Sequence, residues 1–244
     1  SNGNVYIDVD ASNKFTNSDS VIIKNCIFLD NTTDGLAAGD YPGLKLNGGS
    51  WGYGNALIES TTFSGNSNAY GTTSSGRMLY VYKFERLTIK ECRFTDNDNS
   101  GYVLYINGVG AYDQYTQGDV NGVTIENCVF DNNDIRYNSI YFRQCKGTIS
   151  NSTFAHNAST SSSSIATNID GYSSSTYPEK EPDFQFYNCI FHTTDNGNYN
   201  IDEPNSGNNQ FRLYNCLVEG GHNSTDYTIG ANVVSGDPLF TSQL

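Results

Sequence analysis

Apolar and polar residues alternate in a short phrase that occurs seven times along the chain. Each copy has apolar residues at every second position, then in most cases Asn, a small residue that is often Cys, any residue, and Phe. The copies are VIIKNCIF from Val21, ALIESTTF from Ala56, LTIKECRF from Leu87, VTIENCVF from Val123, GTISNSTF from Gly147, FQFYNCIF from Phe184 and FRLYNCLV from Phe211. Because a period of two residues places alternate side chains on opposite faces of an extended chain, each copy predicts β-strand and argues against helix.

The alternation also separates side chains that should point inward from those that should face solvent. One inward stack is expected from Ile23, Ile58, Ile89, Ile125, Ile149, Phe186 and Leu213. A second is expected from the Phe that ends six of the copies, Phe28, Phe63, Phe94, Phe130, Phe154 and Phe191. On the outward side the charge alternates along Lys24, Glu59, Lys90 and Glu126, which predicts a row of exposed ion pairs.

A second strand is expected after each Phe-x-x-Asn turn. Its copies are LKLN from Leu44, LYVY from Leu79, LYIN from Leu104, IYFR from Ile140 and, as a weaker match, IATN from Ile165. Successive Cys positions of the phrase lie 24 to 37 residues apart, which suits fixed core strands joined by loops of variable length. The chain is therefore predicted to be all-β, a right-handed parallel β-helix (solenoid) of about seven rungs. A sandwich or a propeller would need hairpin turns between the strands.

Residues 1–244 are expected to form a single domain. Repeat-like sequence reaches both ends of the chain, and a solenoid needs caps to protect its terminal edges. We therefore expect a fragment of a longer solenoid, with truncation at either end left open.

Two further positions of the phrase predict ladders of identical side chains. The small position holds Cys26, Cys92, Cys128, Cys189 and Cys216, with Thr61 and Ser152 in the other two copies. Parallel stacking keeps neighbouring Cβ atoms too far apart for a disulfide, so buried free thiols are expected, with Cys145 outside the ladder. The other ladder is Asn31, Asn66, Asn97, Asn133 and Asn157, whose stacked amides should bond along the stack and whose backbone should take the left-handed turn conformation.

The phrase Asn-Cys-x-Phe-x-x-Asn resembles the repeats of secreted right-handed parallel β-helix proteins of bacteria and archaea. Its Phe-x-x-Asn part is similar to the repeats of chlamydial polymorphic outer-membrane proteins, although their Gly-Gly-Ala-Ile type motif is reduced here to Gly48-Gly49. The segment GANVVSGDPLF, from Gly230 to Phe240, resembles the Asn-Ile-x-x-Asp-Pro-Leu-Phe segment near the last rungs of many secreted β-helix proteins. The resemblance implies an extracellular or cell-surface protein and implies little about its chemistry.

The charge balance narrows the choice of partners. The chain has 13 Lys and Arg against 26 Asp and Glu, which gives a net charge of −13 and a pI near 4.4. Such a chain repels nucleic acid and anionic membrane surfaces, so no nucleic-acid partner is expected. No apolar run approaches the length of a membrane span, so no membrane insertion by this segment is expected.

The sequence shows no recognisable group of catalytic residues. A calcium-dependent lyase needs a carboxylate cluster with a basic residue nearby, and a glycoside hydrolase needs two or three close carboxylates. Neither stands out, and His156, His192 and His222 occupy unlike positions of the repeats. The segment DNDN at 96–99 offers oxygen ligands to calcium but is equally an ordinary turn. We therefore assign no catalytic residue, no metal site and no cofactor, with calcium as the only ion considered.

The outward side of the second strand is the candidate binding surface. If Leu44, Leu79, Leu104 and Ile140 point inward, two columns face outward: Lys45, Tyr80, Tyr105 and Tyr141 in one, Asn47, Tyr82, Asn107 and Arg143 in the other. Flat aromatic faces beside amides and a guanidinium bind sugar rings and extended peptides. Tyr112 and Tyr115 would extend this surface. Tyr also favours exposed strand positions for packing reasons alone, so a purely structural role stays open.

Together these features predict a non-enzymatic segment that acts as an adhesin-like stalk or as a binding module for a polysaccharide or a host or cell-surface protein. The first alternative is an extracellular polysaccharide lyase or glycoside hydrolase, whose acid and base would lie on loops or in missing rungs. The second alternative is a purely structural spacer.

Overall fold

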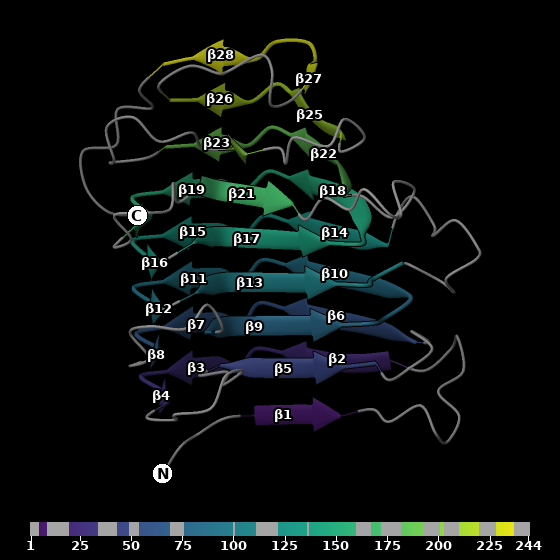
Figure 1. The fold of residues 1–244 in the computed structure, drawn as a ribbon, viewed down its shortest axis with the longest axis vertical. Coiled ribbons are helices and arrows are strands. Elements are labelled where there is room, and N and C mark those ends of the chain that lie inside the picture. The colour runs from purple at the N-terminus through teal and green to yellow at the C-terminus, as the bar shows by residue number, and fades with distance from the viewer. Residues whose placement is uncertain are drawn as a thin grey trace.

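Parallel β-strands make up all the regular structure that can be described. The computed structural model describes residues 5–8, 20–33, 43–48, 54–68, 76–99, 101–110, 122–135, 137–159, 167–171, 182–192, 201–202, 210–219 and 228–236. Within these residues there are 28 strands and no helix, and neighbouring strands pair in parallel (Figure 1). The predicted all-β class is confirmed.

The strands form four sheets, lettered here A to D. Sheet A contains, in spatial order, β1 (Val5–Asp8), β5 (Leu44–Asn47), β9 (Arg77–Tyr82), β13 (Tyr102–Asn107), β17 (Asn138–Arg143), β21 (Thr167–Gly171) and β24 (Ile201–Asp202). Sheet B contains β2 (Ser20–Lys24), β6 (Asn55–Glu59), β10 (Arg86–Lys90), β14 (Val123–Glu126), β18 (Lys146–Ser150), β22 (Asp183–Tyr187), β25 (Gln210–Tyr214) and β27 (Thr228–Ile229). Sheet C contains β3 (Ile27–Leu29), β7 (Thr62–Ser64), β11 (Arg93–Thr95), β15 (Val129–Asp131), β19 (Thr153–Ala155), β23 (Ile190–Phe191), β26 (Leu217–Val218) and β28 (Val234–Ser235). Sheet D contains β4 (Thr32–Thr33), β8 (Ser67–Asn68), β12 (Asp98–Asn99), β16 (Asp134–Ile135) and β20 (Ala158–Ser159).

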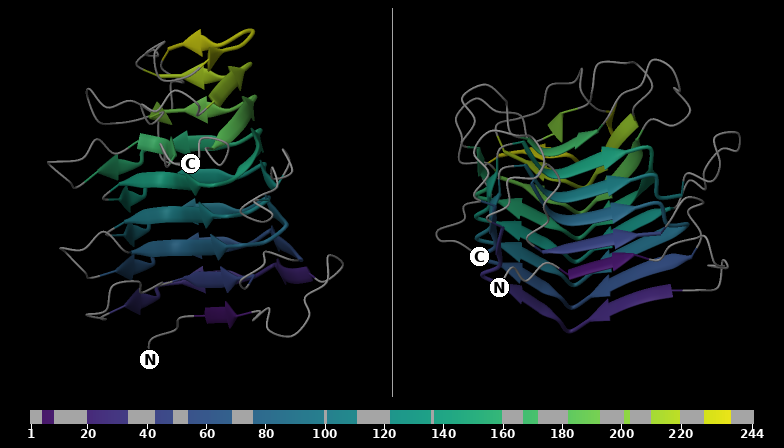
Figure 2. Two further views of the ribbon diagram at one scale, coloured as in Figure 1. Left: turned by 45° about the vertical axis from the view of Figure 1, so that its right-hand side comes forward. Right: turned by 60° about the horizontal axis from the view of Figure 1, so that its bottom comes forward.

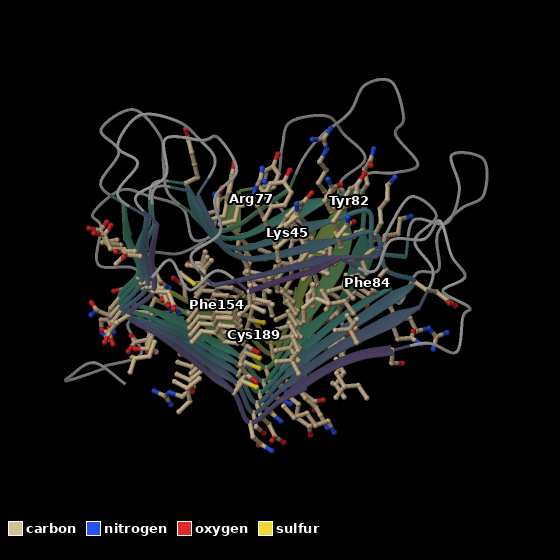
Figure 3. All side chains as sticks on the ribbon, turned by 90° about the horizontal axis from the view of Figure 1, so that it is seen from below. Lys45, Arg77, Tyr82, Phe84, Phe154 and Cys189 are labelled. Atoms are coloured by element: carbon tan, nitrogen blue, oxygen red, sulfur yellow. The ribbon has the colours of Figure 1, made fainter. Side chains whose placement is uncertain are left out.

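Successive strands of the central repeats fall in sheets B, C, D and A in turn. Each strand then pairs with its equivalent in the repeat before and the repeat after, so the sheets grow along one axis (Figures 1 and 2). Sheets B and C meet at a sharp angle, and sheet A lies across from that corner (Figure 3). This arrangement of parallel sheets around one core is compatible with a β-helix.

Both predicted apolar stacks lie in register inside this core. The Ile position aligns from Ile23 to Leu213 through seven strands of sheet B. The Phe position aligns from Phe28 to Phe191 through six strands of sheet C, with ring centroids 4.7–5.0 Å apart and planes within 9° of parallel. Both stacks are buried apart from Phe28, which is half-buried at the end of its row. The predicted inward faces are confirmed.

The residue before the Cys position turns the chain between sheets B and C. It has a positive φ in all seven copies: Asn25, Ser60, Glu91, Asn127, Asn151, Asn188 and Asn215. Asn tolerates this left-handed conformation better than most residues, which accounts for its presence at this corner. Each phrase, predicted as one strand, is therefore two strands in two sheets.

The Asn ladder is present, but its predicted backbone conformation is wrong. Each ladder amide donates one hydrogen bond to the Oδ1 of the next ladder Asn, at 2.8–2.9 Å from Asn31 through Asn133. The left-handed residue is the one before, at Asp30, Gly65, Asp96, Asn132 and His156. The residue before each ladder Asn makes the turn, because the ladder side chain itself must point inward to reach the next repeat.

The small-residue ladder lies at the corner between sheets B and C. All six cysteines are free thiols, and all but the half-buried Cys26 are buried, including Cys145. Ladder thiols lie close to the carbonyl two residues earlier, as Cys92 Sγ does at 3.2 Å from the oxygen of Lys90. Thr61 and Ser152 continue the row with hydroxyls that bond to the same type of carbonyl. The predicted inward ladder is confirmed.

The buried thiols should be chemically inert in the native protein. The contact with Cys92 and burial both raise the pKa of the Cys128 thiol, and the contact with Cys216 does the same for Cys189. Because the thiolate is the reactive form, iodoacetamide should modify these two cysteines only after denaturation. Peptide mass spectrometry of the native protein checks this, with Cys26 as the internal control that should react first. Native labelling of the buried thiols at the rate of Cys26, or a mass loss from disulfides, would contradict it.

The exposed ion-pair row of sheet B is formed in its first three members. Glu59 lies between two lysines, with its carboxylate oxygens 2.6 Å from Lys24 Nζ and 2.7 Å from Lys90 Nζ. The hydrogen bonds from these two lysines lower the pKa of Glu59. Glu126 lies in register beside Lys90.

Candidate functional site

The outward face of sheet A carries the residues that the sequence singled out. Strands β5, β9, β13 and β17 pair in parallel, and their register places Lys45, Tyr80, Tyr105 and Tyr141 in one column and Asn47, Tyr82, Asn107 and Arg143 in the other. Leu44, Leu79, Leu104 and Ile140 are fully buried on the opposite side. Both predicted columns are therefore confirmed as aligned positions. Figure 3 shows Lys45 and Tyr82 pointing away from the core that contains Phe154 and Cys189.

The fifth copy of the second strand was placed incorrectly by the sequence. Strand β21 pairs with β17 through Ile169 opposite Ile140 and Asp170 opposite Tyr141. The predicted IATN from Ile165 thus began four residues too early, because Ile165 and Ile169 both fit an apolar position in a polar stretch. The tyrosine column consequently ends at Tyr141, and an Asp follows it.

Six tyrosines form one connected aromatic cluster on this face. Tyr105 lies at its centre, with ring centroids 5.3 Å from Tyr80, 5.3 Å from Tyr102 and 5.2 Å from Tyr141. The remaining contacts join Tyr80 to Tyr82, Tyr102 to Tyr141 and Tyr102 to Tyr137. Edge-to-face and offset-stacked pairs at these distances attract one another beyond the area they bury. We call these six residues the tyrosine cluster.

The central ring of the tyrosine cluster is not exposed as predicted. The side chains packed around Tyr105 leave it only 6% exposed, whereas Tyr80, Tyr82 and Tyr141 are half-buried. Truncating Tyr105 would therefore damage packing as well as any binding surface. Tyr112 and Tyr115 lie outside the described residues.

Positive charges lie directly on the tyrosine rings. The Arg77 guanidinium carbon is 4.2 Å from the centroid of Tyr105 and 4.8 Å from that of Tyr80. The Lys45 ammonium is 5.9 Å from the Tyr80 centroid, and the Lys83 ammonium is 5.0 Å from that of Tyr82. A cation over an aromatic face is held by the negative potential of the ring. The cluster therefore holds these three cations on the outward face.

Arg77 and Tyr102 were missed because the period of two breaks at the start of the strand. Counting back from Leu79 places Arg77 on the inward face, but Met78 and Leu79 are both buried, as are Val103 and Leu104. Arg77 and Tyr102 pair across β9 and β13, and both contact outward-facing tyrosines. Two consecutive apolar residues stand at the same place in both strands, Met78–Leu79 and Val103–Leu104, and this pair indicates the break in the period of two.

A second group of polar side chains lies at the end of sheet C. His156 Nδ1 is 2.7 Å from Asp131 Oδ1, and His192 Nδ1 is 2.5 Å from Glu219 Oε2. The two imidazole rings are 5.0 Å apart in an edge-to-face arrangement. His156 and His192 do occupy unlike repeat positions, the second and the first residue after their Phe, and their rings meet across neighbouring repeats all the same. His222 lies outside the described residues.

The register of sheet C shows which residues flank the two histidines. Asp131 is in register with Ala155, and Phe154 is in register with Phe191 immediately before His192. His156, the residue after Ala155, has a left-handed backbone conformation. Aligning the residue after each Phe would have placed Asp131, Ala155 and His192 in one row.

No metal centre is found in the part of the chain that the structure describes. No group of three or more His, Cys, Asp or Glu side chains there is arranged to hold a metal ion. In the DNDN segment the Asn97 amide bonds to Asn133 and to the carbonyl of Phe63, so it serves the ladder. The same described ranges contain no helix with the length and apolarity of a membrane span.

Comparison with known proteins adds no relative. No protein-family model, no curated protein and no solved structure matches this chain.

Proposed function

We propose that this chain is part of an extracellular or cell-surface right-handed parallel β-helix of about seven repeats, which binds a polysaccharide without turning it over. The repeated Asn-Cys-x-Phe-x-x-Asn phrase, which resembles the repeats of secreted β-helix proteins, supports the extracellular assignment. The four sheets, the strand order and the stacked ladders support the solenoid interpretation. A stalk that also displays the binding surface is consistent with the same architecture.

The observation that carries the binding proposal is the tyrosine cluster with its three cations. Pyranose rings bind to proteins through their apolar C–H faces on aromatic rings and through hydroxyls on flanking polar groups. The cluster supplies the rings, and Asn107 and Arg143 in the neighbouring column supply an amide and a guanidinium.

The strands hold the tyrosine cluster in a fixed conformation in the absence of a ligand, and this rigidity favours binding. The tyrosines stand on hydrogen-bonded strands, and the residues beneath them are fully buried. A preformed site avoids much of the entropic cost of ordering side chains on association. A long, repetitive ligand suits a surface that extends over several repeats.

Replacing Tyr82 by Ala should weaken glycan binding by about 1 kcal/mol, or about fivefold, as expected for loss of one aromatic contact. Tyr82 is the residue chosen for replacement, in place of the buried Tyr105, because it lies at the edge of the cluster and is only half-buried. A glycan array identifies the ligand, and isothermal calorimetry measures the change.

The matched control is Tyr187→Ala, which removes a tyrosine stacked on Tyr214 at 5.0 Å on sheet B, away from this face. This variant should bind as the parent does. Equal loss in both variants, or full binding after Tyr80 and Tyr82 are both replaced, would remove sheet A as the binding site.

One observation favours the enzymatic alternative, a polysaccharide lyase or glycoside hydrolase. A carboxylate at Nδ1 orients an imidazole and leaves Nε2 to accept a proton, which is the arrangement of a general base. Asp131–His156 has this form, and Glu219 places a carboxylate oxygen 2.5 Å from the same ring nitrogen of His192. Sustained release of reducing or unsaturated sugar ends that is lost in His156→Gln or His192→Gln would establish the alternative over pure binding.

A further inference from the structure

We infer that Asn151 is an attachment site for an N-linked glycan, and that the folded chain carries no such glycan on the ladder residues Asn31 and Asn157. The inference rests on the extracellular part of the proposed function, because N-linked glycans are added to chains that are being exported. All three asparagines begin an Asn-x-Ser/Thr sequon: NTT from Asn31, NST from Asn151 and NAS from Asn157. The structure places them in two different environments.

The two ladder asparagines use their side-chain nitrogens inside the molecule. Asn31 Nδ2 donates to Asn66 Oδ1 at 2.8 Å. Asn157 is only 7% exposed, and its Nδ2 donates to the carbonyl of Phe130 at 3.0 Å. A glycan is bulky and hydrated, so attachment to either nitrogen would place it against the buried ladder and break the stacked bonds.

Asn151 instead lies at the corner between sheets B and C, and its side chain is exposed. Its backbone N–H donates to the carbonyl of Tyr187 at 2.9 Å, and its Oδ1 accepts from Asn188 Nδ2 at 3.0 Å. Neither bond uses Nδ2, which is the atom that receives the sugar. Asn127 and Asn188 occupy the same corner in the neighbouring repeats and are exposed as well, so an attached glycan would extend into solvent.

The hydroxyl that completes the sequon is specific to this repeat. Five copies have Asn at the corner, which its positive φ accounts for: Asn25, Asn127, Asn151, Asn188 and Asn215. The residues two positions later are, in the same order, Ile27, Val129, Thr153, Ile190 and Leu217. Thr153 therefore provides the one corner sequon among these five copies.

The transfer would form a bond between Asn151 Nδ2 and C1 of the first sugar of a lipid-linked oligosaccharide diphosphate. The bond from C1 to the diphosphate oxygen breaks, the lipid diphosphate leaves, and Nδ2 gives up a proton to a base of the transferring enzyme. The product is still an amide, so Oδ1 keeps its capacity to accept the hydrogen bond from Asn188.

The position of the corner is compatible with the proposed binding surface. Sheets B and C meet at this corner, and sheet A lies across the core from it (Figure 3). A glycan on Asn151 would therefore cover the corner and leave the tyrosine cluster accessible. Enzymatic removal of the glycan should leave the affinity of sheet A for its ligand unchanged within about twofold.

The test is secretion of the chain from a eukaryotic host cell, followed by peptide mass spectrometry. Asn223→Gln is present in every protein, because the sequon NST from Asn223 lies outside the described residues. Treatment with a peptide N-glycosidase converts each glycosylated Asn to Asp. We expect this conversion at Asn151 and at neither Asn31 nor Asn157, and thermal unfolding verifies that the protein is folded.

Matched variants assign the glycan to the sequon of Asn151. Thr153→Val removes the hydroxyl and keeps both Asn151 and a β-branched side chain on the half-buried outward position, so the glycan should be lost completely. Thr153→Ser restores a sequon and should restore the glycan. Ser159→Ala removes the sequon of Asn157 without altering its ladder amide and should leave the glycan unchanged.

The outcomes separate this inference from the function on which it rests. Secreted, folded protein that lacks a glycan on Asn151, or that carries one on Asn31 or Asn157, would overturn the inference and leave the extracellular assignment standing. A glycan that persists in Thr153→Val would also overturn it. A chain that folds when made in the cytoplasm but not when secreted would overturn the extracellular assignment and this inference together.

Discussion

Replacing Phe94 by Ala is expected to lower the free energy of unfolding by about 3 to 5 kcal/mol. The Phe94 ring is fully buried and lies between Phe63 at 4.9 Å and Phe130 at 4.7 Å. The neighbouring strands are fixed by hydrogen bonds on both sides, so they cannot close the cavity by moving together. Denaturant unfolding followed by circular dichroism measures the loss.

The matched control for Phe94 is Phe28→Ala at the same register position. Phe28 is half-buried and stacks on Phe63 at the end of the described row. Its truncation should cost clearly less than that of Phe94. Equal costs at the two positions, or a loss below about 1 kcal/mol for Phe94→Ala, would contradict a tightly packed central stack.

Replacing Asn97 by Ala is expected to cost about 2 to 5 kcal/mol for a different reason. Its Nδ2 donates to Asn133 Oδ1 at 2.8 Å and to the carbonyl of Phe63 at 3.0 Å, and its Oδ1 accepts from the backbone and side chain of Asn66. All of these groups are buried, so removing the amide leaves several polar atoms without these partners in a place that water does not reach.

Asn31→Ala provides the comparison for Asn97→Ala. Asn31 is half-buried at the end of the described ladder, and its backbone N–H and side-chain Nδ2 both donate to Asn66 Oδ1. Its removal should cost markedly less. Native-state hydrogen exchange gives a second readout, because loss of Asn97 should speed exchange at the Asn66 amide that it accepts from.

The apolar period and the repeated phrase were sufficient to predict the register of the core. Ile125 and Phe130 could be placed because alternation in a β-strand follows from backbone geometry and does not depend on the rest of the fold. The Tyr columns followed from the same rule, since β9 and β13 align as their sequences do.

The errors occurred where the chain departs from simple alternation. The sharp turn at Asn127 converts one predicted strand into two, and its left-handed φ is a property that hydrophobicity does not encode. The burial of Tyr105 depends on Arg77 and Tyr102, which the break in period hid. The His156–His192 contact joins two different repeat positions of neighbouring repeats, so it becomes visible only when the repeats are stacked.

The Asn ladder has a direction. From Asn31 to Asn133 each Nδ2 donates to the Oδ1 of the ladder Asn in the following repeat, so each of these Oδ1 atoms accepts from the preceding one. The amide dipoles therefore all point the same way and reinforce one another along the stack. Reversing one amide within the ladder would place two Nδ2 groups or two Oδ1 groups face to face, so the orientation of one Asn side chain fixes that of its neighbours.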